Sequence, residues 1–143
     1  MRSLEILVVD DDDADAFMIS EALESSQTRP TVNRVSDGRE ALDYLRRVDP
    51  YTDAHRPDLI LLDLNMPRMD GRETLAAIKT DDRLKTIPVV ILTTSGAAPD
   101  IAASYQHRAN AYVTKPFDLE DFESTVRTID RFYREVAVLP PAD

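Results

Sequence analysis

The chain has 143 residues, enough for one domain with a sizeable core and short for two. Its 17 basic and 27 acidic residues give a net charge of −10, which argues against binding to nucleic acid or to an anionic membrane through a basic patch. The absence of cysteine excludes a disulfide framework and a thiolate metal site and fits a reducing cytoplasm. No aliphatic run is long enough to span a membrane, and the early acidic residues do not suit a signal peptide. We therefore expect a cytoplasmic protein whose partners are proteins or cations.

Five short runs predict β-strands. Leu4–Val9, Leu59–Leu62 and Ile87–Leu92 are almost entirely aliphatic, as in strands that are covered on both faces of a parallel sheet. Thr31–Val35 is more polar and predicts an edge strand, and Ala111–Thr114 predicts a short fifth strand.

The segments between and after these runs have apolar residues at helical spacing. The clearest pattern comes last, with apolar residues three and four positions apart at Leu119, Phe122, Val126, Ile129, Tyr133 and Val136. It predicts one unbroken amphipathic helix that begins just after Pro116 and packs on the sheet, and we favour this over an isolated coiled coil because the run is short. Five strands alternating with five helices predict a doubly wound α/β fold with right-handed crossovers.

We expect residues 1–143 to form a single domain, with a core of about 3–135, a frayed tail at 136–143 and no output domain. The polar segment PYTDAHRP, residues 50–57, predicts a long loop before the third strand. Phe132, Val136 and Leu139 form a second apolar strip at the end of the last helix. This strip predicts either a homodimer surface or packing of the tail.

Reactive side chains follow the strands at the point where each strand ends. They are Asp10 and Asp11, Asp63, Thr93 and Thr94, and Lys115. Ligands of open α/β sheets bind outside the carboxyl ends of the strands, so we expect these residues to meet. Three close carboxylates repel one another unless a cation is bound, and Mg²⁺ is the first candidate for an all-oxygen site. Three carboxylates, one Mg²⁺ and the Lys115 ammonium together would have no net charge. Such a site could receive a phosphoryl group on one of its carboxylates.

Several of these residues also have a purely structural interpretation. Asp12 or Asp13 suits the N-cap of the first helix, and Asp15 is favourable in its first turn. Thr93 alone could simply end a strand, and Lys115 alone could be a solvated charge. Asp63 is different because it directly follows the apolar run LILL, where an unpaired charge would be costly.

Four segments resemble the motifs of the receiver domain of two-component response regulators. They are ILVVDDDD, LILLDLNMPRMDG, PVVILTTS and AYVTKPF, in the order and at the spacing of that family. The resemblance covers nearly the whole chain. It implies a flavodoxin-like five-stranded parallel sheet of order 2-1-3-4-5 with five helices, and a role as a phosphorelay switch rather than as an enzyme, with self-phosphorylation and slow self-dephosphorylation as the only chemistry.

The resemblance also implies roles for the acidic residues. Asp63 would be the phosphoacceptor and would take the phosphoryl group from a phosphohistidine on a sensor histidine kinase. Asp11 and Asp63 would bind Mg²⁺ directly, Asp10 would act largely through metal-bound water, and the backbone carbonyl of Asn65 would be a further ligand.

The other implied roles concern binding of the phosphoryl group and switching. Lys115 would pair with the phosphoryl group, and its peptide bond to Pro116 would be cis. Thr93 and Tyr112 would be the switch pair, with the aromatic ring turning inward when the threonine hydroxyl moves toward the acyl phosphate. The alternative for Tyr112 is an ordinary half-buried strand residue. Thr94, like Asn65, would flank the path of an attacking water.

Two features depart from the commonest receiver pattern. Arg108 stands where many receivers have glycine after the fourth helix, so the end of that helix is expected to differ. The loop at 50–57 is longer than usual. With the long last helix, it makes the chain similar to stand-alone receivers that serve phytochrome-type and hybrid sensor kinases, and the signal would then pass by contact to a protein effector or a phosphotransfer protein.

Three other functions remain as alternatives. An aspartyl-phosphate phosphatase usually has a second aspartate two positions after its nucleophile, where this chain has Asn65. A nucleotide or flavin site after the first strand needs a glycine-rich loop, but the chain has DDDD there. A pure interaction module would not need the complete set of reactive side chains.

Overall fold

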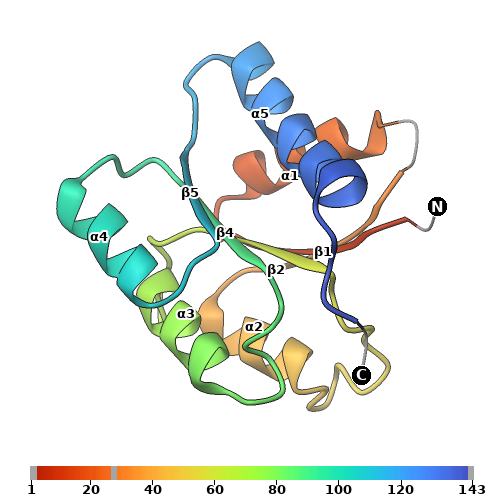
Figure 1. The fold of residues 1–143 in the computed structure, drawn as a ribbon, viewed down its shortest axis with the longest axis vertical. Coiled ribbons are helices and arrows are strands. Elements are labelled where there is room, and N and C mark those ends of the chain that lie inside the picture. The colour runs from red at the N-terminus through yellow and green to blue at the C-terminus, as the bar shows by residue number, and fades with distance from the viewer. Residues whose placement is uncertain (1–2, 27–28, 142–143) are drawn as a thin grey trace.

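The computed structural model describes residues 3–26 and 29–141 and contains one five-stranded parallel sheet (Figure 1). The strand order is β2-β1-β3-β4-β5, which confirms the predicted fold class and the edge position of β2. The strands are β1 (Glu5–Val9), β2 (Thr31–Val35), β3 (Leu59–Leu62), β4 (Val89–Thr93) and β5 (Ala111–Thr114). The helices are α1 (Asp13–Glu24), α2 (Gly38–Leu45), α3 (Gly71–Thr80), α4 (Ala98–Gln106), α5 (Leu119–Arg131) and the π-helical segment η1 (Phe132–Val136).

The sheet separates two apolar layers, and this explains why its central strands are aliphatic at every position (Figure 1). In β3, Ile60 and Leu62 belong to the layer under α2 and α3, whereas Leu59 and Leu61 face α1 and α5. All four side chains are buried. Burial of each such side chain stabilises the fold by roughly 1.5–3 kcal/mol. The tightly packed central strands therefore give the polar residues at their ends a rigid support.

Aspartate side chains begin four of the α-helices. Asp12, Asp37, Asp70 and Asp118 each accept a hydrogen bond from the backbone N–H three residues later. Such caps satisfy N–H groups that have no partner within the helix. The assignment of Asp12 to the helix start is thus confirmed.

The C-terminal region differs from the predicted unbroken helix and frayed tail. The α-helix ends at Arg131, and the chain continues as a π-helical turn in which the Ala137 N–H donates to the Phe132 carbonyl. This wider turn changes the phase of the apolar stripe. Leu139 consequently packs against the layer beneath α1 and α5, while Phe132 and Val136 stay exposed. Of the predicted frayed tail, Leu139 contacts the core whereas Val138 is fully exposed, and residues 142–143 lie outside the described part.

One prediction about the backbone is wrong and another is confirmed. In the described part the cis peptide bond is Asp49–Pro50, and the Lys115–Pro116 bond is not cis. The free-energy difference between cis and trans X-Pro bonds is small, so the dipeptide alone does not determine the isomer. The end of α4 does differ from the usual glycine cap, because Arg108 itself takes the left-handed conformation with φ of 70°.

Within the described residues, no helix is both long enough and apolar enough to cross a membrane.

Candidate functional site

Three carboxylates come together at the carboxyl edge of the sheet. Asp10 follows β1, Asp63 follows β3, and one oxygen from each of Asp10, Asp11 and Asp63 lies within 4.8 Å of the others. Asp10 and Asp63 are buried, whereas Asp11 faces solvent. Oxygen ligands with a concentrated negative charge suit a hard divalent cation, and the exposed carboxylate of Asp11 leaves the cation a route of entry. The donor set therefore fits Mg²⁺.

The ammonium of Lys115 lies beside two of these carboxylates. Its Nζ lies 2.8 Å from Asp10 Oδ2 and 3.3 Å from Asp63 Oδ2. A third contact, 2.8 Å long, reaches Asp15 Oδ2 on α1. The short strand β5 delivers this lysine to the site, and the lysine is itself buried. The ammonium therefore compensates the acidic cluster directly and is not a solvated surface charge.

Burial and neighbouring charges have opposite effects on the pKa values of the residues in this cluster. Burial raises the pKa of Asp10 above its usual value of 3.8, and the hydrogen bond from Lys115 offsets part of that effect. Burial alone would lower the pKa of Lys115, but its hydrogen bonds to Asp10 and Asp15 and the charges of Asp10 and Asp63 outweigh burial and raise it. The lysine therefore keeps its positive charge and is available to an anionic group at Asp63.

Thr93 has an unusual environment. It ends β4, its side chain is fully buried, and its hydroxyl oxygen has no hydrogen-bond partner among the described residues. An unmade hydrogen bond in the interior costs roughly 1–3 kcal/mol, so such groups usually have a ligand, a water or a functional reason. An acceptor oxygen bound at this edge of the sheet would satisfy the hydroxyl. The buried hydroxyl therefore fits the expected hydrogen-bond donor to a phosphoryl group better than a residue that only ends a strand.

Tyr112 is half-buried in β5 and packs against the layer under α2 and α3. Its hydroxyl donates to the Ser95 carbonyl at 2.7 Å, which ties the ring to the loop between β4 and α4. Ser95 in turn donates to Asp100 at 2.6 Å, and Arg72 on α3 contacts Asp100 at 2.7 Å. The loop that follows Thr93 is thereby linked to both β5 and α3.

The remaining predicted residues lie at the rim of the site. The Asn65 backbone N–H is 3.5 Å from Asp63 Oδ1, and its side chain is exposed. Thr94 is exposed next to buried Thr93. Pro116 follows Lys115 and is partly buried.

Sequence reasoning missed two residues at the site. Asp15 was assigned only to the first helical turn, although it contacts Lys115. Its position four residues after Asp11 was the available signal, because one helical turn returns a side chain to the same side. Arg34 in β2 donates to the Asp10 carbonyl at 3.0 Å and to Asp13 at 2.8 Å, and no local pattern marks it.

The loop after β3 is packed closely against the start of α3. A Cβ added to Gly71 would lie 2.0 Å from the Asp63 carbonyl oxygen, too close for any real side chain. The Gly71 N–H also donates to the Leu64 carbonyl at 2.9 Å. Glycine is therefore required for α3 to begin directly beside Asp63.

Together with this geometry, the family comparison identifies the class of protein. The response regulator receiver domain family matches residues 6–127. The chain belongs to this family, whose members are phosphorelay signalling proteins that work with sensor histidine kinases and a divalent metal.

Three comparisons show members of that family to which the chain is similar. Response regulator Rcp1 of Synechocystis sp. is 43% identical over 137 residues, which cover 96% of this chain and 93% of Rcp1. The structure of the phosphorylated cyanobacterial phytochrome response regulator RcpA is 47% identical, with a TM-score of 0.94 and coverage of 97% and 99%. The structure of the Mn²⁺-bound form of Rcp1 is 42% identical, with a TM-score of 0.91 and coverage of 96% and 99%. The chain is thus similar to these regulators along nearly their whole length.

Proposed function

We propose that Asp63 is the phosphoacceptor of this receiver. The observation that carries the proposal is the environment of its carboxylate, which lies beside Asp10, Asp11 and the Lys115 ammonium while the Thr93 hydroxyl is buried without a partner. A buried carboxylate with a cation on one side and a metal-binding cluster on the other is suited to attack an electrophilic phosphorus.

In the reaction, an oxygen of Asp63 forms a bond to phosphorus while the P–N bond of the donor phosphohistidine breaks and the imidazole leaves. With acetyl phosphate as donor, a P–O bond breaks and acetate leaves. A bound Mg²⁺ supplies charge neutralisation at the phosphoryl oxygens. Lys115 neutralises a second oxygen and Thr93 donates a hydrogen bond to another. The carboxylates of Asp11 and Asp63 and the Asn65 carbonyl would hold the ion directly, and Asp10 would hold it through water.

The decisive experiment is incubation with acetyl phosphate and Mg²⁺, followed by intact-mass measurement. We expect one added phosphoryl group in the wild type and in Asp53→Asn, and none in Asp63→Asn. A retained gain in Asp63→Asn would refute the assignment.

A matched threonine pair tests the role of Thr93. Thr93→Val removes the buried hydroxyl, whereas Thr94→Val removes an exposed one from the next residue. We expect phosphorylation of Thr93→Val to slow by about tenfold or more, the scale for removal of one donor from a charged transition state. A similar rate in both variants would remove Thr93 from the phosphoryl site.

The output is a change of protein-binding surface on the face formed by α4, β5 and α5. Tyr112 is the second member of the switch pair, because its hydroxyl bond to Ser95 couples β5 to the loop that follows Thr93. This chemistry, self-phosphorylation and slow self-dephosphorylation, makes the protein a switch and not a turnover enzyme. Hydrolysis of small phosphate esters far beyond stoichiometry would contradict this.

We propose that this receiver acts in the cytoplasm. Its partners would be a sensor kinase of phytochrome or hybrid type and, downstream, a protein effector or phosphotransfer protein. The names of RcpA and of two bacteriophytochrome response regulators among the similar structures support this choice. Phosphotransfer from a panel of the host's kinases tests it, and exclusive transfer from unrelated kinases would refute it.

Homodimerisation through the last helix is a further part of the proposal. Phe132 and Val136 remain exposed there, whereas Leu139 packs on its own chain. Sedimentation at high protein concentration tests this surface. A monomer both with and without phosphorylation would refute it.

A further inference from the structure

The edge of the sheet opposite Asp63 has an unexpectedly basic pocket. Its volume is about 380 Å³, and it is lined by Leu45, Arg46, Arg47, Arg56, Asp81, Arg83 and Leu84. Arg56 precedes the start of β3, whereas Asp63 follows its end, so the length of the strand separates the pocket from the phosphorylation site. Four arginines and one aspartate line this pocket in a chain of net charge −10.

Two of the four guanidinium groups have no partner among the described residues. Arg46 has a long contact of 3.4 Å with Asp81, and Arg56 donates to the Arg83 carbonyl at 2.6 Å and to Thr86 at 3.1 Å. For the side chains of Arg47 and Arg83, the described part of the chain provides no hydrogen bond or ion pair. A guanidinium beyond the C-terminus of a helix also interacts favourably with the helix dipole. This applies to Arg46 and Arg47 after α2 and to Arg83 after α3, but not to Arg56 in the loop before β3.

Arg47 has an energetically unfavourable backbone conformation. Its φ is 56°, the left-handed region that glycine or asparagine adopts more easily at a helix end. Arg56 is fixed by its two hydrogen bonds and is partly buried. The cavity thus has one guanidinium held in place and two that are free to bind.

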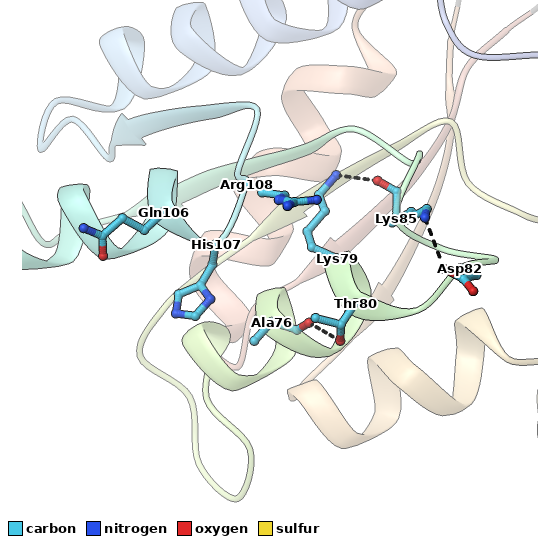
Figure 2. A pocket seen from close by; sticks show the side chains of 8 residues that line it. All are labelled: Ala76, Lys79, Thr80, Asp82, Lys85, Gln106, His107 and Arg108. Carbon is cyan, nitrogen blue, oxygen red and sulfur yellow. Dashed lines mark hydrogen bonds and ion pairs between the residues drawn. The ribbon is translucent and has the colours of Figure 1, made fainter.

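A neighbouring basic pocket between the ends of α3 and α4 shows the contrast (Figure 2). The Lys79 ammonium there donates to the Lys85 and Ile87 carbonyls and to Asn110 Oδ1, at 3.0, 2.8 and 3.2 Å, which uses all three of its protons. Lys85 pairs with Asp82 at 3.1 Å. Those two lysines are therefore already occupied by the protein. Among the described residues, Arg108 is the one guanidinium of this pocket without a partner, compared with two in the four-arginine pocket.

We propose that the four-arginine pocket binds a nucleoside di- or triphosphate. Guanidinium groups bind phosphate oxygens in a bidentate manner and stack on planar rings, which suits both parts of such a ligand. The pocket volume falls within the range of roughly 300–1,000 Å³ that is typical of small-molecule sites. Leu45 and Leu84 provide apolar contacts for the base, while Arg47 and Arg83 bind the phosphates.

The test is an NMR titration of the full chain with ADP and, separately, with inorganic pyrophosphate, both without Mg²⁺. We expect saturable shifts at residues 45–47, 56 and 81–84, with ADP binding more tightly than pyrophosphate. Equal affinity for the two would overturn the nucleoside part of the proposal and leave a site for bare phosphate anions. Shifts confined to Thr93 and Lys115 would place the anion at the phosphorylation site and overturn the proposal, as would the absence of saturable shifts.

Two double variants test whether Arg47 and Arg83 are responsible for binding. Arg47→Gly suits the left-handed backbone, and Arg83→Gln changes an exposed side chain, so the double variant should fold. We expect it to bind ADP at least about tenfold more weakly, while Arg39→Gln with Arg131→Gln, which removes the same charge elsewhere, changes affinity by less than about twofold. Equal losses in both would show general charge attraction and refute a site. An unchanged rate of phosphorylation by acetyl phosphate checks that the double variant is folded.

Discussion

The completely buried carboxylate of Asp37 forms an ion pair with the guanidinium of Arg68, 31 residues away. Asp37 precedes α2, and Arg68 belongs to the loop that joins β3 to α3. The same two segments are joined by a hydrogen bond of 3.1 Å from the Gly38 N–H to the Met69 carbonyl. The turn before α2 therefore holds the loop that follows Asp63, and that loop carries one of the proposed metal ligands.

The Asp37 carboxylate is expected to stabilise the fold only when it is ionised. Burial raises its pKa, but the hydrogen bonds from the Glu40 N–H and from Arg68 outweigh burial, so the pKa lies below the usual 3.8. The folded state thus binds its proton less readily than the unfolded chain does. The stabilisation is complete above the ordinary pKa and is lost as the pH falls through the lowered value.

Accordingly, Asp37→Asn should lower the free energy of unfolding near neutral pH by about 1–2 kcal/mol, through loss of the ion pair and weakening of the helix cap. The difference from wild type should shrink as the pH falls below 3.8. Urea unfolding across this range measures it, with exposed Asp53→Asn as the control. A difference that stays constant with pH would contradict the role of the charge.

Lys115→Met should separate metal binding from phosphorylation. Removing the ammonium leaves the buried carboxylates of Asp10 and Asp63 uncompensated, so Mg²⁺ should bind at least as tightly as in wild type. Phosphorylation by acetyl phosphate should slow by about tenfold or more, because a cation at the phosphoryl group is lost. Calorimetry and intact-mass kinetics provide the two measurements.

The same variant should also become dependent on metal for stability. Without Mg²⁺, the unpaired buried charges should cost about 3 kcal/mol, and saturating Mg²⁺ should restore most of this. Lys85→Met, which loses only an exposed ion pair to Asp82, is the control. Weaker Mg²⁺ binding in Lys115→Met would show that the lysine organises the cluster rather than competing with the cation.

We expect the contribution of Lys79 to the free energy of unfolding to increase at alkaline pH. Burial lowers the pKa of its ammonium from 10.5 to about 8. Between these values the unfolded chain keeps a proton that the folded chain has lost, so this residue's contribution to the free energy of unfolding increases with pH. The increase should not exceed about 3 kcal/mol. Comparison with Lys79→Met isolates it, and an NMR titration midpoint above 10.5 for the Lys79 amine would disprove it.

Arg108→Gly should stabilise the protein. Arg108 has φ of 70°, where a Cβ is unfavourable and glycine is not. We expect the free energy of unfolding to rise by about 0.5–1 kcal/mol, measured by thermal and urea denaturation. The matched change Arg127→Gly, within α5, should lower it by about 1 kcal/mol. Destabilisation by both changes would mean that the Arg108 side chain contributes more than its backbone costs.

The fold was predictable because its signals are local. Leu59–Leu62 is aliphatic at every position, and only a strand buried on both faces explains that pattern together with its short length. The residues at strand ends followed from the topology, because parallel strands bring their carboxyl ends to one edge. The sequence alone is therefore enough to predict that the acidic residues gather at this edge.

Other features depend on contacts that no local pattern encodes. Arg68 and Arg34 act on residues in different segments, and their neighbours in sequence do not reveal this. The π-helical turn depends on how Leu139 meets the core, and the isomer at Pro116 depends on small energies set by the surroundings. Sequence patterns indicate the local conformation that a residue favours, whereas these features depend on tertiary contacts in the folded chain.

Gly71 has a consequence for how the domain moves. Because no side chain fits between the start of α3 and the Asp63 carbonyl, this helix and the end of β3 are in direct backbone contact. A phosphoryl group at Asp63 then has little freedom to displace α3 alone. On phosphorylation we therefore expect the displacement in the loop after Thr93, which is linked to β5 by the hydrogen bond from Tyr112 to Ser95 rather than by close backbone packing. We therefore expect α3 to keep its position relative to Asp63 when the loop after Thr93 moves.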